Sequence, residues 1–167
     1  MIVSFLRRLF FFALLLLVQA FILNQVNILG YATPMLFVFF LLMFNRGSSR
    51  LSLLFWGFLM GFLMDLFTNT PGVGAASCTL LGMIQPVLLN LFVPRESPED
   101  LEPSIKQQGW AKFSGYLLLS TFLFYISYYL LLAFSLAHLE DLVINVIGGT
   151  LFTFVLMLGL NSLYIRS

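Results

Sequence analysis

Residues 57–65 read GFLMGFLMD, in which a Gly-Phe-Leu-Met unit occurs twice and the next position in the same phase holds Asp65. Gly57, Gly61 and Asp65 are four residues apart, so on a helix they form one stripe on a single face. Small residues at this spacing let two helix backbones approach closely in a membrane. The stretch therefore predicts a transmembrane helix with a close-packed neighbour and a carboxylate at one end of the contact.

The composition around this stretch is typical of an integral membrane protein. Of the 167 residues, 60% are hydrophobic and 9% are charged, and the mean hydropathy is +1.01. Soluble domains carry roughly 25% charged residues. No basic cluster or RNA-binding signature indicates nucleic acid as a partner. Cys78 is the only cysteine, which excludes an intrachain disulfide and any multi-cysteine metal site.

Six apolar segments have the length, or nearly the length, of a transmembrane helix. They cover residues 9–29, 31–44, 51–68, 72–93, 113–135 and 142–165, so we expect a single all-α domain with six transmembrane helices. The first run follows Arg7 and Arg8 and lacks a small-residue cleavage site, which indicates a first span rather than a signal peptide.

The distribution of charge predicts the orientation. All eight Lys and Arg residues lie on one side of the six-span arrangement. By the positive-inside rule this side is the cytoplasm, and it holds both termini. The polar stretch 94–112, with three prolines and four acidic residues, is expected to be a flexible cytoplasmic loop that is too short for a domain.

The second segment has an unusual start. In ATPMLFVFFLLMF (32–44), Thr33 stands as a helix N-cap and Pro34 as the first helical residue. A helix that starts there has only about 11 residues and a length of about 16 Å, half of a bilayer. The alternative is a kinked helix that begins earlier, near Ile28. A short helix would leave a recess on the outer side.

The fourth segment carries a second series of small residues, Gly74, Cys78 and Gly82, followed by Pro86. The link TNTPG is short, and Thr70-Pro71 within it is another cap-then-proline helix start. The third and fourth segments are therefore expected to be antiparallel neighbours whose small stripes face each other.

In that pairing Asp65 lies level with the start of the fourth helix. The first N–H groups of a helix lack partners within the helix and attract an anion, so they are the expected partners of the carboxylate. Asn69, Asn145, His138 or a second protein are the alternatives. Three roles stay open for Asp65: a lock for the hairpin, a binding or coupling group, and a catalytic group.

Polar residues within the membrane gather in the outer third, which predicts either a recess or a docking surface for a partner there. Besides Asp65 and Asn145, they are Asn24, Gln25, Asn27 and Asn69. His138, Glu140 and Asp141 could hold a metal ion, but one histidine without distant partners favours a solvated loop. No reactive pair for an enzyme can be assembled, so we expect no catalysis, no metal and no cofactor.

The stretch GFLMGFLMDLFTNTPGVGAAS (57–77) resembles the signature of the rod shape-determining protein MreD family. That signature runs Gly-Phe-x-x-Gly-x-x-x-Asp-Leu, a short turn, and a glycine-containing start of the next helix, which Gly57, Gly61, Asp65 and Gly74 match. TPMLFVFFLLMF (33–44) is similar to the family's second span, and the region of Asn145 to its last. The family often has a proline shortly after that asparagine, whereas here Gly148-Gly149-Thr150 follow.

The resemblance implies a non-catalytic scaffold in the inner membrane of a bacterium, within the machinery that elongates the cell. It implies MreC as a direct partner, with MreB filaments, a peptidoglycan polymerase and a transpeptidase as indirect partners, and membrane lipid around the helices. It also implies a fold similar to the substrate-binding subunits of energy-coupling-factor vitamin transporters. Such a transporter subunit is the alternative function.

Overall fold

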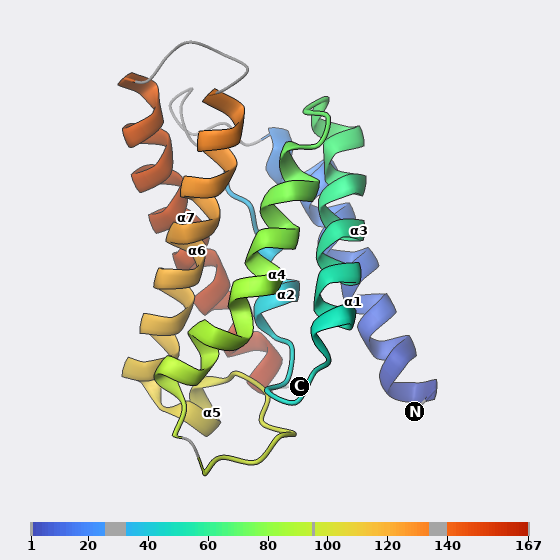
Figure 1. The fold of residues 1–167 in the computed structure, drawn as a ribbon, viewed down its shortest axis with the longest axis vertical. Coiled ribbons are helices and arrows are strands. Elements are labelled where there is room, and N and C mark those ends of the chain that lie inside the picture. Colours follow the sequence, from blue (N-terminus) through green and yellow to red (C-terminus); the bar gives the residue numbers. More distant parts are fainter. Residues whose placement is uncertain (1, 26–32, 95, 134–139, 167) are drawn as a thin grey trace.

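The computed structural model describes residues 2–25, 33–94, 96–133 and 140–166, and the described part contains helices and no strand. Figure 1 shows the helices, most of which run nearly parallel to the long axis of the molecule. They are α1 (Ile2–Phe21), a 3-10 turn η1 (Leu23–Gln25), α2 (Val38–Leu42), α3 (Arg50–Thr68), α4 (Val73–Phe92), α5 (Ile105–Gln108), α6 (Trp110–Ala133) and α7 (Glu140–Arg166).

Within the described residues, five helices are long and apolar enough to cross a membrane: α1, α3, α4, α6 and α7. The bounds of α3 and α4 agree with the predicted spans 51–68 and 72–93, and α6 and α7 lie close to the predicted 113–135 and 142–165. The prediction for the first span was shifted, because α1 begins at Ile2 rather than at residue 9. The chain therefore has the helices of a multi-pass membrane protein.

The long helices pack in chain order. α3 lies against α4, α4 against α6, and α6 against α7, while α1 covers α3. The short helix α2 lies between them and contacts α1, α3, α4 and α6. Its residues Val38, Phe39, Leu41 and Leu42 are fully buried. The most hydrophobic part of the predicted second span thus forms the centre of the core.

The second segment is not a spanning helix. Residues 33–37 lack helical structure, and α2 begins at Val38 and ends five residues later, at Leu42. The assignment of Thr33 as N-cap and Pro34 as first helical residue is therefore wrong. A kinked helix from Ile28 is also excluded for its described part, although residue 28 itself lies outside the described residues. The physical reason is a set of side chains from other helices that bind this backbone, described below.

This irregular segment still leads from one end of the molecule to the other. Figure 1 shows it descending from the upper half, through α2, to the turn that precedes α3. As a result both chain ends lie at the lower end of the molecule in Figure 1.

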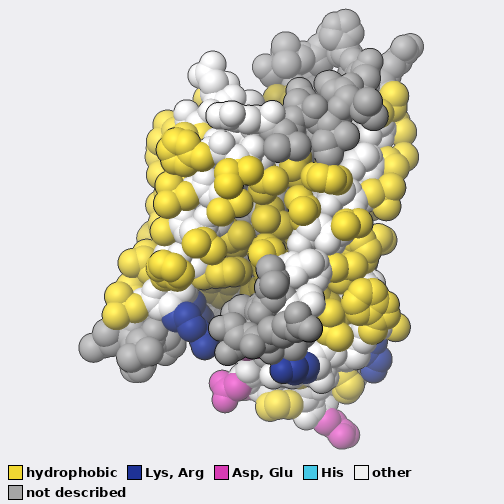
Figure 2. All heavy atoms as spheres, turned by 180° about the vertical axis from the view of Figure 1, so that it is seen from behind, with side chains coloured by type: hydrophobic (Ala, Val, Ile, Leu, Met, Phe, Trp, Pro, Cys, Tyr) yellow, Lys and Arg dark blue, Asp and Glu magenta, His cyan; other side chains and the backbone are white. Residues whose placement is uncertain are grey.

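Charged side chains gather at that same lower end. Figure 2 shows a broad hydrophobic belt, with Lys, Arg, Asp and Glu side chains below it. The described basic residues there come from the start of α1, the turn before α3 and the first residue of α3, and the region from α5 to the start of α6; they are Arg7, Arg8, Arg46, Arg50, Lys106 and Lys112. We call this the basic end and the opposite one the outer end.

The described part of the polar stretch 94–112 makes contacts that were not predicted from the sequence. It contains the short helix α5 and is bound to the turn before α3 in its described part. The Arg46 guanidinium donates to the carbonyl oxygens of Pro94 (3.3 Å) and Ser97 (2.7 Å), and to the Asn90 side chain (3.1 Å). The Gly47 N–H donates to the Glu99 carbonyl at 2.8 Å. These contacts attach the loop to the turn before α3.

Candidate functional site

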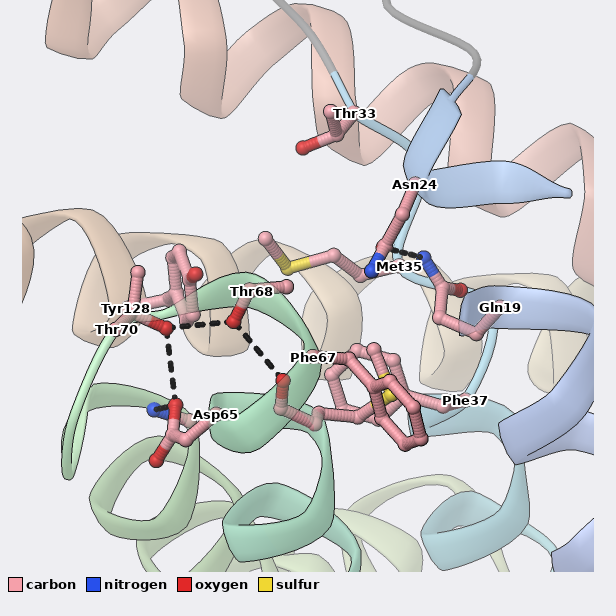
Figure 3. A pocket seen from close by; sticks show the side chains of 12 residues that line it. Gln19, Asn24, Thr33, Met35, Phe37, Asp65, Phe67, Thr68, Thr70 and Tyr128 are labelled. Atoms are coloured by element: carbon pink, nitrogen blue, oxygen red, sulfur yellow. Dashed lines mark hydrogen bonds between the residues drawn. The ribbon is translucent and has the colours of Figure 1, made fainter. Parts of the chain in front are cut away.

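Asp65 lies at the contact between the end of α3 and the start of α4, and its side chain is only 5% exposed. Its Oδ1 accepts from the Gly74 N–H at 2.7 Å, and its Oδ2 accepts from the Ala75 N–H at 2.9 Å. The Thr70 hydroxyl donates to Oδ1 at 3.1 Å, as Figure 3 shows. The predicted contact with the first N–H groups of the fourth helix is confirmed. It gives hydrogen-bond partners to two backbone donors that have none within the helix.

The backbone of Asp65 also ends α3. Its carbonyl accepts from the N–H groups of Asn69 and, at 3.3 Å, Thr70. Asn69 has a φ of 55°, in the left-handed region, and closes the helix in the way that glycine or asparagine commonly does. Asn69 therefore acts at this site through its backbone, and its exposed side chain is not part of the recess lining.

The start of α4 differs from the prediction. Gly72, with a φ of 85°, precedes the first helical residue, Val73, so Thr70 and Pro71 do not form a cap and a first helical position. The Thr70 hydroxyl points to the Asp65 carboxylate instead. The carboxylate supplies the capping acceptor that the sequence analysis assigned to threonine.

The small residues of α3 and α4 face each other in an antiparallel register, as predicted. A β-carbon at Gly61 would overlap the carbonyl oxygen of Gly74, and one at Gly57 would lie 2.8 Å from that of Cys78. One at Gly82 would lie 3.0 Å from the carbonyl oxygen of Leu53. Cys78 is a buried free thiol within this contact. The stripe makes the hairpin a rigid unit because no side chain separates the two backbones.

A recess of about 390 Å³ opens at the outer end beside this hairpin. Figure 3 shows it between the end of α3, the side chain of Tyr128 from α6, and residues of α1 and the irregular segment. Its lining mixes polar and apolar side chains: Gln19, Asn24, Thr33, Met35, Phe37, Met64, Asp65, Phe67, Thr68, Thr70, Gly74 and Tyr128. The predicted outer recess is therefore present.

Only part of the predicted outer cluster takes part in this recess. Asn24 lines it and accepts a hydrogen bond of 3.1 Å from the Gln19 amide. Gln25 is exposed at the end of η1 and is not among the lining residues, and Asn27 lies outside the described residues. Asn145 is on α7 and likewise not among the lining residues; its side-chain oxygen is buried and has no hydrogen-bond partner within the described part.

Two side chains whose link to the irregular segment was not predicted from the sequence hold this segment at its outer end. Gln19 Nε2 donates to the Pro34 carbonyl at 2.7 Å, and Gln19 Oε1 accepts from the Leu36 N–H at 2.8 Å. The Tyr125 hydroxyl accepts from the Met35 N–H at 3.0 Å and donates to the Thr33 carbonyl at 2.9 Å. We call these two side chains the outer clamp.

A second pair holds the same segment toward the basic end. The Tyr116 hydroxyl donates to the Leu42 carbonyl at 3.0 Å, and Gln85 donates to the Phe44 carbonyl at 3.3 Å and to Tyr116 at 3.1 Å. A non-helical backbone within a membrane is tolerated only where protein groups satisfy its N–H and C=O groups. Two glutamines and two tyrosines occur within otherwise apolar helices, and these polar residues are the sequence signal that could have indicated such a segment.

Other candidate chemistry is not assembled in the described part of the chain. His138 lies outside the described residues, and the side chains of Glu140 and Asp141 are not described either. Among the described residues there is no group of three His, Cys, Asp or Glu side chains that could hold a metal ion. The hydroxyl oxygens of Tyr125 on α6 and Thr153 on α7 are 2.7 Å apart, which links these two helices by a hydrogen bond.

No family model, no curated protein and no solved structure matches this chain.

Proposed function

We propose that this chain is a non-catalytic membrane scaffold of the bacterial cell-elongation machinery, similar to the MreD family. In this role it binds MreC and helps to couple MreB filaments to peptidoglycan synthases. The proposal rests on the motif of Gly57, Gly61, Asp65 and Gly74 and on the structural use of these four residues in one hairpin.

The observation that carries the proposal is the state of the Asp65 carboxylate. Both of its oxygens accept hydrogen bonds from backbone N–H groups of α4, and the side chain is buried. A carboxylate whose two oxygens already accept hydrogen bonds from backbone N–H groups caps the start of α4 and is poorly placed to act on a substrate. This supports a structural role for the most conspicuous ionisable residue, and with it a scaffold rather than an enzyme.

The two ends of the molecule provide contact surfaces suited to a scaffold. At the outer end, the recess and the rim formed by Thr68, Thr70 and Asn24 would face a partner outside the cytoplasm, such as MreC. At the basic end, the loop held by Arg46 presents exposed Glu96, Glu99 and Asp100 toward the cytoplasm. Rigid surfaces at both ends would let one chain link components on either side of the membrane.

The alternative, a vitamin-binding subunit of an energy-coupling-factor transporter, is favoured by the size of the outer recess. Its volume of about 390 Å³ falls within the roughly 300–1,000 Å³ of small-molecule sites. Against it, the most buried polar groups of the lining already have partners within the chain. Gln19 binds the irregular segment and Asp65 binds α4, so few polar groups converge on a ligand.

Purification of the tagged chain from its native membrane in mild detergent separates the two functions. Co-purification of MreC and cell-wall synthases supports the scaffold. Co-purification of an ATPase module and a bound vitamin contradicts it and identifies a transporter subunit. A tagged, unrelated multi-span protein from the same membrane serves as the control for non-specific capture.

A further inference from the structure

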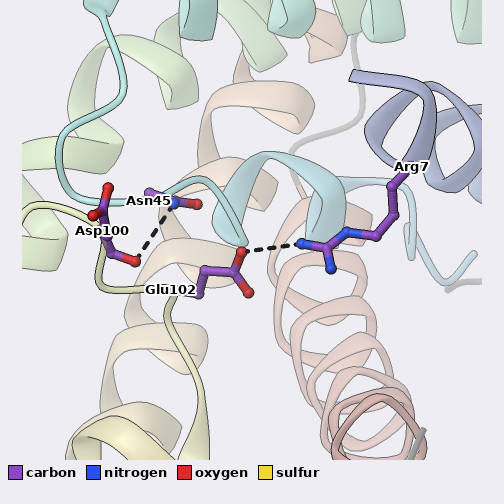
Figure 4. A network of polar contacts seen from close by, with 4 residues as sticks. All are labelled: Arg7, Asn45, Asp100 and Glu102. Carbon is purple, nitrogen blue, oxygen red and sulfur yellow. Dashed lines mark hydrogen bonds and ion pairs between the residues drawn. The ribbon is translucent and has the colours of Figure 1, made fainter. Parts of the chain in front are cut away.

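A small cavity at the basic end, lined by both charged and apolar side chains, lies apart from the outer recess and from the hairpin. It has a volume of about 60 Å³ and is formed by the start of α1, the turn after α2 and the loop before α5. Figure 4 shows Arg7 extending from α1 toward Glu102, next to Asn45. The lining residues are Arg7, Arg8, Phe11, Met43, Asn45 and Glu102.

The charges of this lining leave a net positive site. Arg7 and Arg8 contribute two guanidinium groups, and Glu102 contributes one carboxylate. The Arg7–Glu102 pair is 3.4 Å apart and the Arg7 side chain is 65% exposed, so this ion pair binds weakly. A guanidinium has five N–H donors, and Arg7 retains donors for a further acceptor. One singly charged anion would neutralise the site.

Arg8 is held at the rim of the cavity. Its guanidinium lies over the Phe44 ring, 5.3 Å from the ring centre. This packing orients the cation without using its N–H donors on a carboxylate. Asn45 adds a polar amide, whose Nδ2 donates only a long bond of 3.5 Å to the Asp100 carbonyl. The cavity thus combines two guanidinium groups and an amide, which are the groups that recognise a phosphate.

The setting of the cavity selects the source of that phosphate. On α1, Phe11, Leu14 and Val18 follow Arg7 at four, seven and eleven residues and share its face. Leu14 is 43% exposed, and Phe11 and Val18 are half-buried, so an apolar track leads from the cavity into the membrane. A free phosphate has no apolar part that could contact these side chains, whereas a phospholipid would place an acyl chain on them.

We propose that this cavity binds the phosphodiester headgroup of an anionic glycerophospholipid. The phosphate binds Arg7, Arg8 and Asn45, and an acyl chain lies along Phe11 and Leu14. Basic pockets at the cytoplasmic side of membrane helices bind anionic lipid headgroups by the same chemistry. The inference does not depend on the scaffold function, because it uses residues of neither the hairpin nor the recess.

The test is native mass spectrometry of the intact chain in detergent, titrated separately with dioleoyl phosphatidylglycerol and dioleoyl phosphatidylcholine. We expect the first phosphatidylglycerol to bind at least about tenfold more tightly, because only its net charge complements the site. Excess inorganic phosphate should leave this binding unchanged. Equal affinity for the two lipids, or displacement of the lipid by phosphate, would overturn the proposal.

Variants test the residues of the site. A basic residue near an anionic lipid contributes about a fivefold gain in affinity, so Arg7→Gln with Arg8→Gln should weaken phosphatidylglycerol binding about thirtyfold. Arg50→Gln with Lys112→Gln removes two exposed charges from the same end, outside the cavity, and should have little effect. An equal loss in both double variants would show general surface attraction and overturn the site.

Glu102→Gln should change the affinity for phosphatidylglycerol in the opposite direction. A gain in affinity cannot be explained by a loss of folding. Removal of the only carboxylate in the lining raises the net charge of the cavity. We expect phosphatidylglycerol to bind about fivefold more tightly to this variant, with phosphatidylcholine unaffected. Weaker binding of phosphatidylglycerol would contradict the proposed position of the headgroup.

Discussion

The Asp65 carboxylate and the Gly74 amide lie at hydrogen-bond distance, 2.7 Å, across the turn that joins α3 to α4. This bond, with that to Ala75, places a buried anion on the free donors of a helix start. The same side chain that interrupts an apolar sequence therefore connects the two helices of the hairpin.

Asp65→Asn should destabilise the chain strongly. An amide can present one acceptor to α4, but its NH₂ group would then face the second backbone donor. Since hydrogen bonds to charged groups contribute about 1.5–3 kcal/mol each, we expect a loss of about 3 kcal/mol. Thermal unfolding in detergent measures it, and Asp100→Asn, an exposed change in the loop, serves as control. Equal melting temperatures for the two variants would remove the assigned role of Asp65.

Gly61→Ala should separate α3 from α4. The added β-carbon would overlap the Gly74 carbonyl, which is backbone and cannot move alone. Overpacking of this kind costs about 1–3 kcal/mol. Gly159→Ala is the matched control, because a β-carbon there meets no atom within 4 Å, and the better helix propensity of alanine should stabilise α7 slightly. A Gly61→Ala protein as stable as wild type would show that the two backbones are not in contact.

Gln19→Leu should release the irregular segment at its outer end. The substitution leaves the Leu36 N–H and the Pro34 carbonyl buried without their present partner. The expected loss is about 2–4 kcal/mol, from two unsatisfied backbone groups. Gln107→Leu, on the exposed side of α5, should change stability by less than about 0.5 kcal/mol. Hydrogen exchange should rise at residues 35–40 in the first variant alone; unchanged exchange there would contradict the clamp.

Arg46→Ala should free the loop between α4 and α5. The arginine side chain donates to Asn90, Pro94 and Ser97, and no other residue replaces these bonds in the described structure. We expect a glutamyl endopeptidase to cleave after Glu96 or Glu99 about tenfold faster, as local opening becomes easier by roughly 1.4 kcal/mol. Arg50→Ala removes a nearby exposed arginine and should leave the rate unchanged. Equal rates in both variants would indicate that the loop does not depend on Arg46.

The parts of this structure that could be predicted from the sequence depend on local rules. The stripe of Gly57 and Gly61 predicted a closely packed neighbouring helix. The small residues from Gly74 to Gly82 identified that neighbour as the next helix, after a short turn. The free N–H groups of a helix start explain why Asp65 lies where it does. The apolar lengths likewise predicted α3, α4, α6 and α7 with small errors at their ends.

The parts that could not be predicted depend on side-chain contacts between different elements, which the local rules do not include. Thr33 and Pro34 formed a plausible helix start, but their carbonyls bind Tyr125 and Gln19, which are 92 and 15 residues away. Thr70 likewise met the local rule for a cap, yet its hydroxyl binds a carboxylate on the preceding helix. The loop 94–112 was expected to be flexible because its composition is polar, and its attachment to Arg46 and Gly47 is visible only in three dimensions.

The most direct measurement replaces the native gene with the Asp65→Ala, Gly61→Leu and Gly159→Ala variants, each at matched membrane abundance. Cell shape is recorded, together with the amount of MreC that co-purifies with each variant. The proposed function predicts rounded cells and loss of MreC for the first two, and normal rods with normal MreC for Gly159→Ala. Normal shape and full retention of MreC with Asp65→Ala and Gly61→Leu would contradict the proposal that this hairpin supports a scaffold of cell elongation.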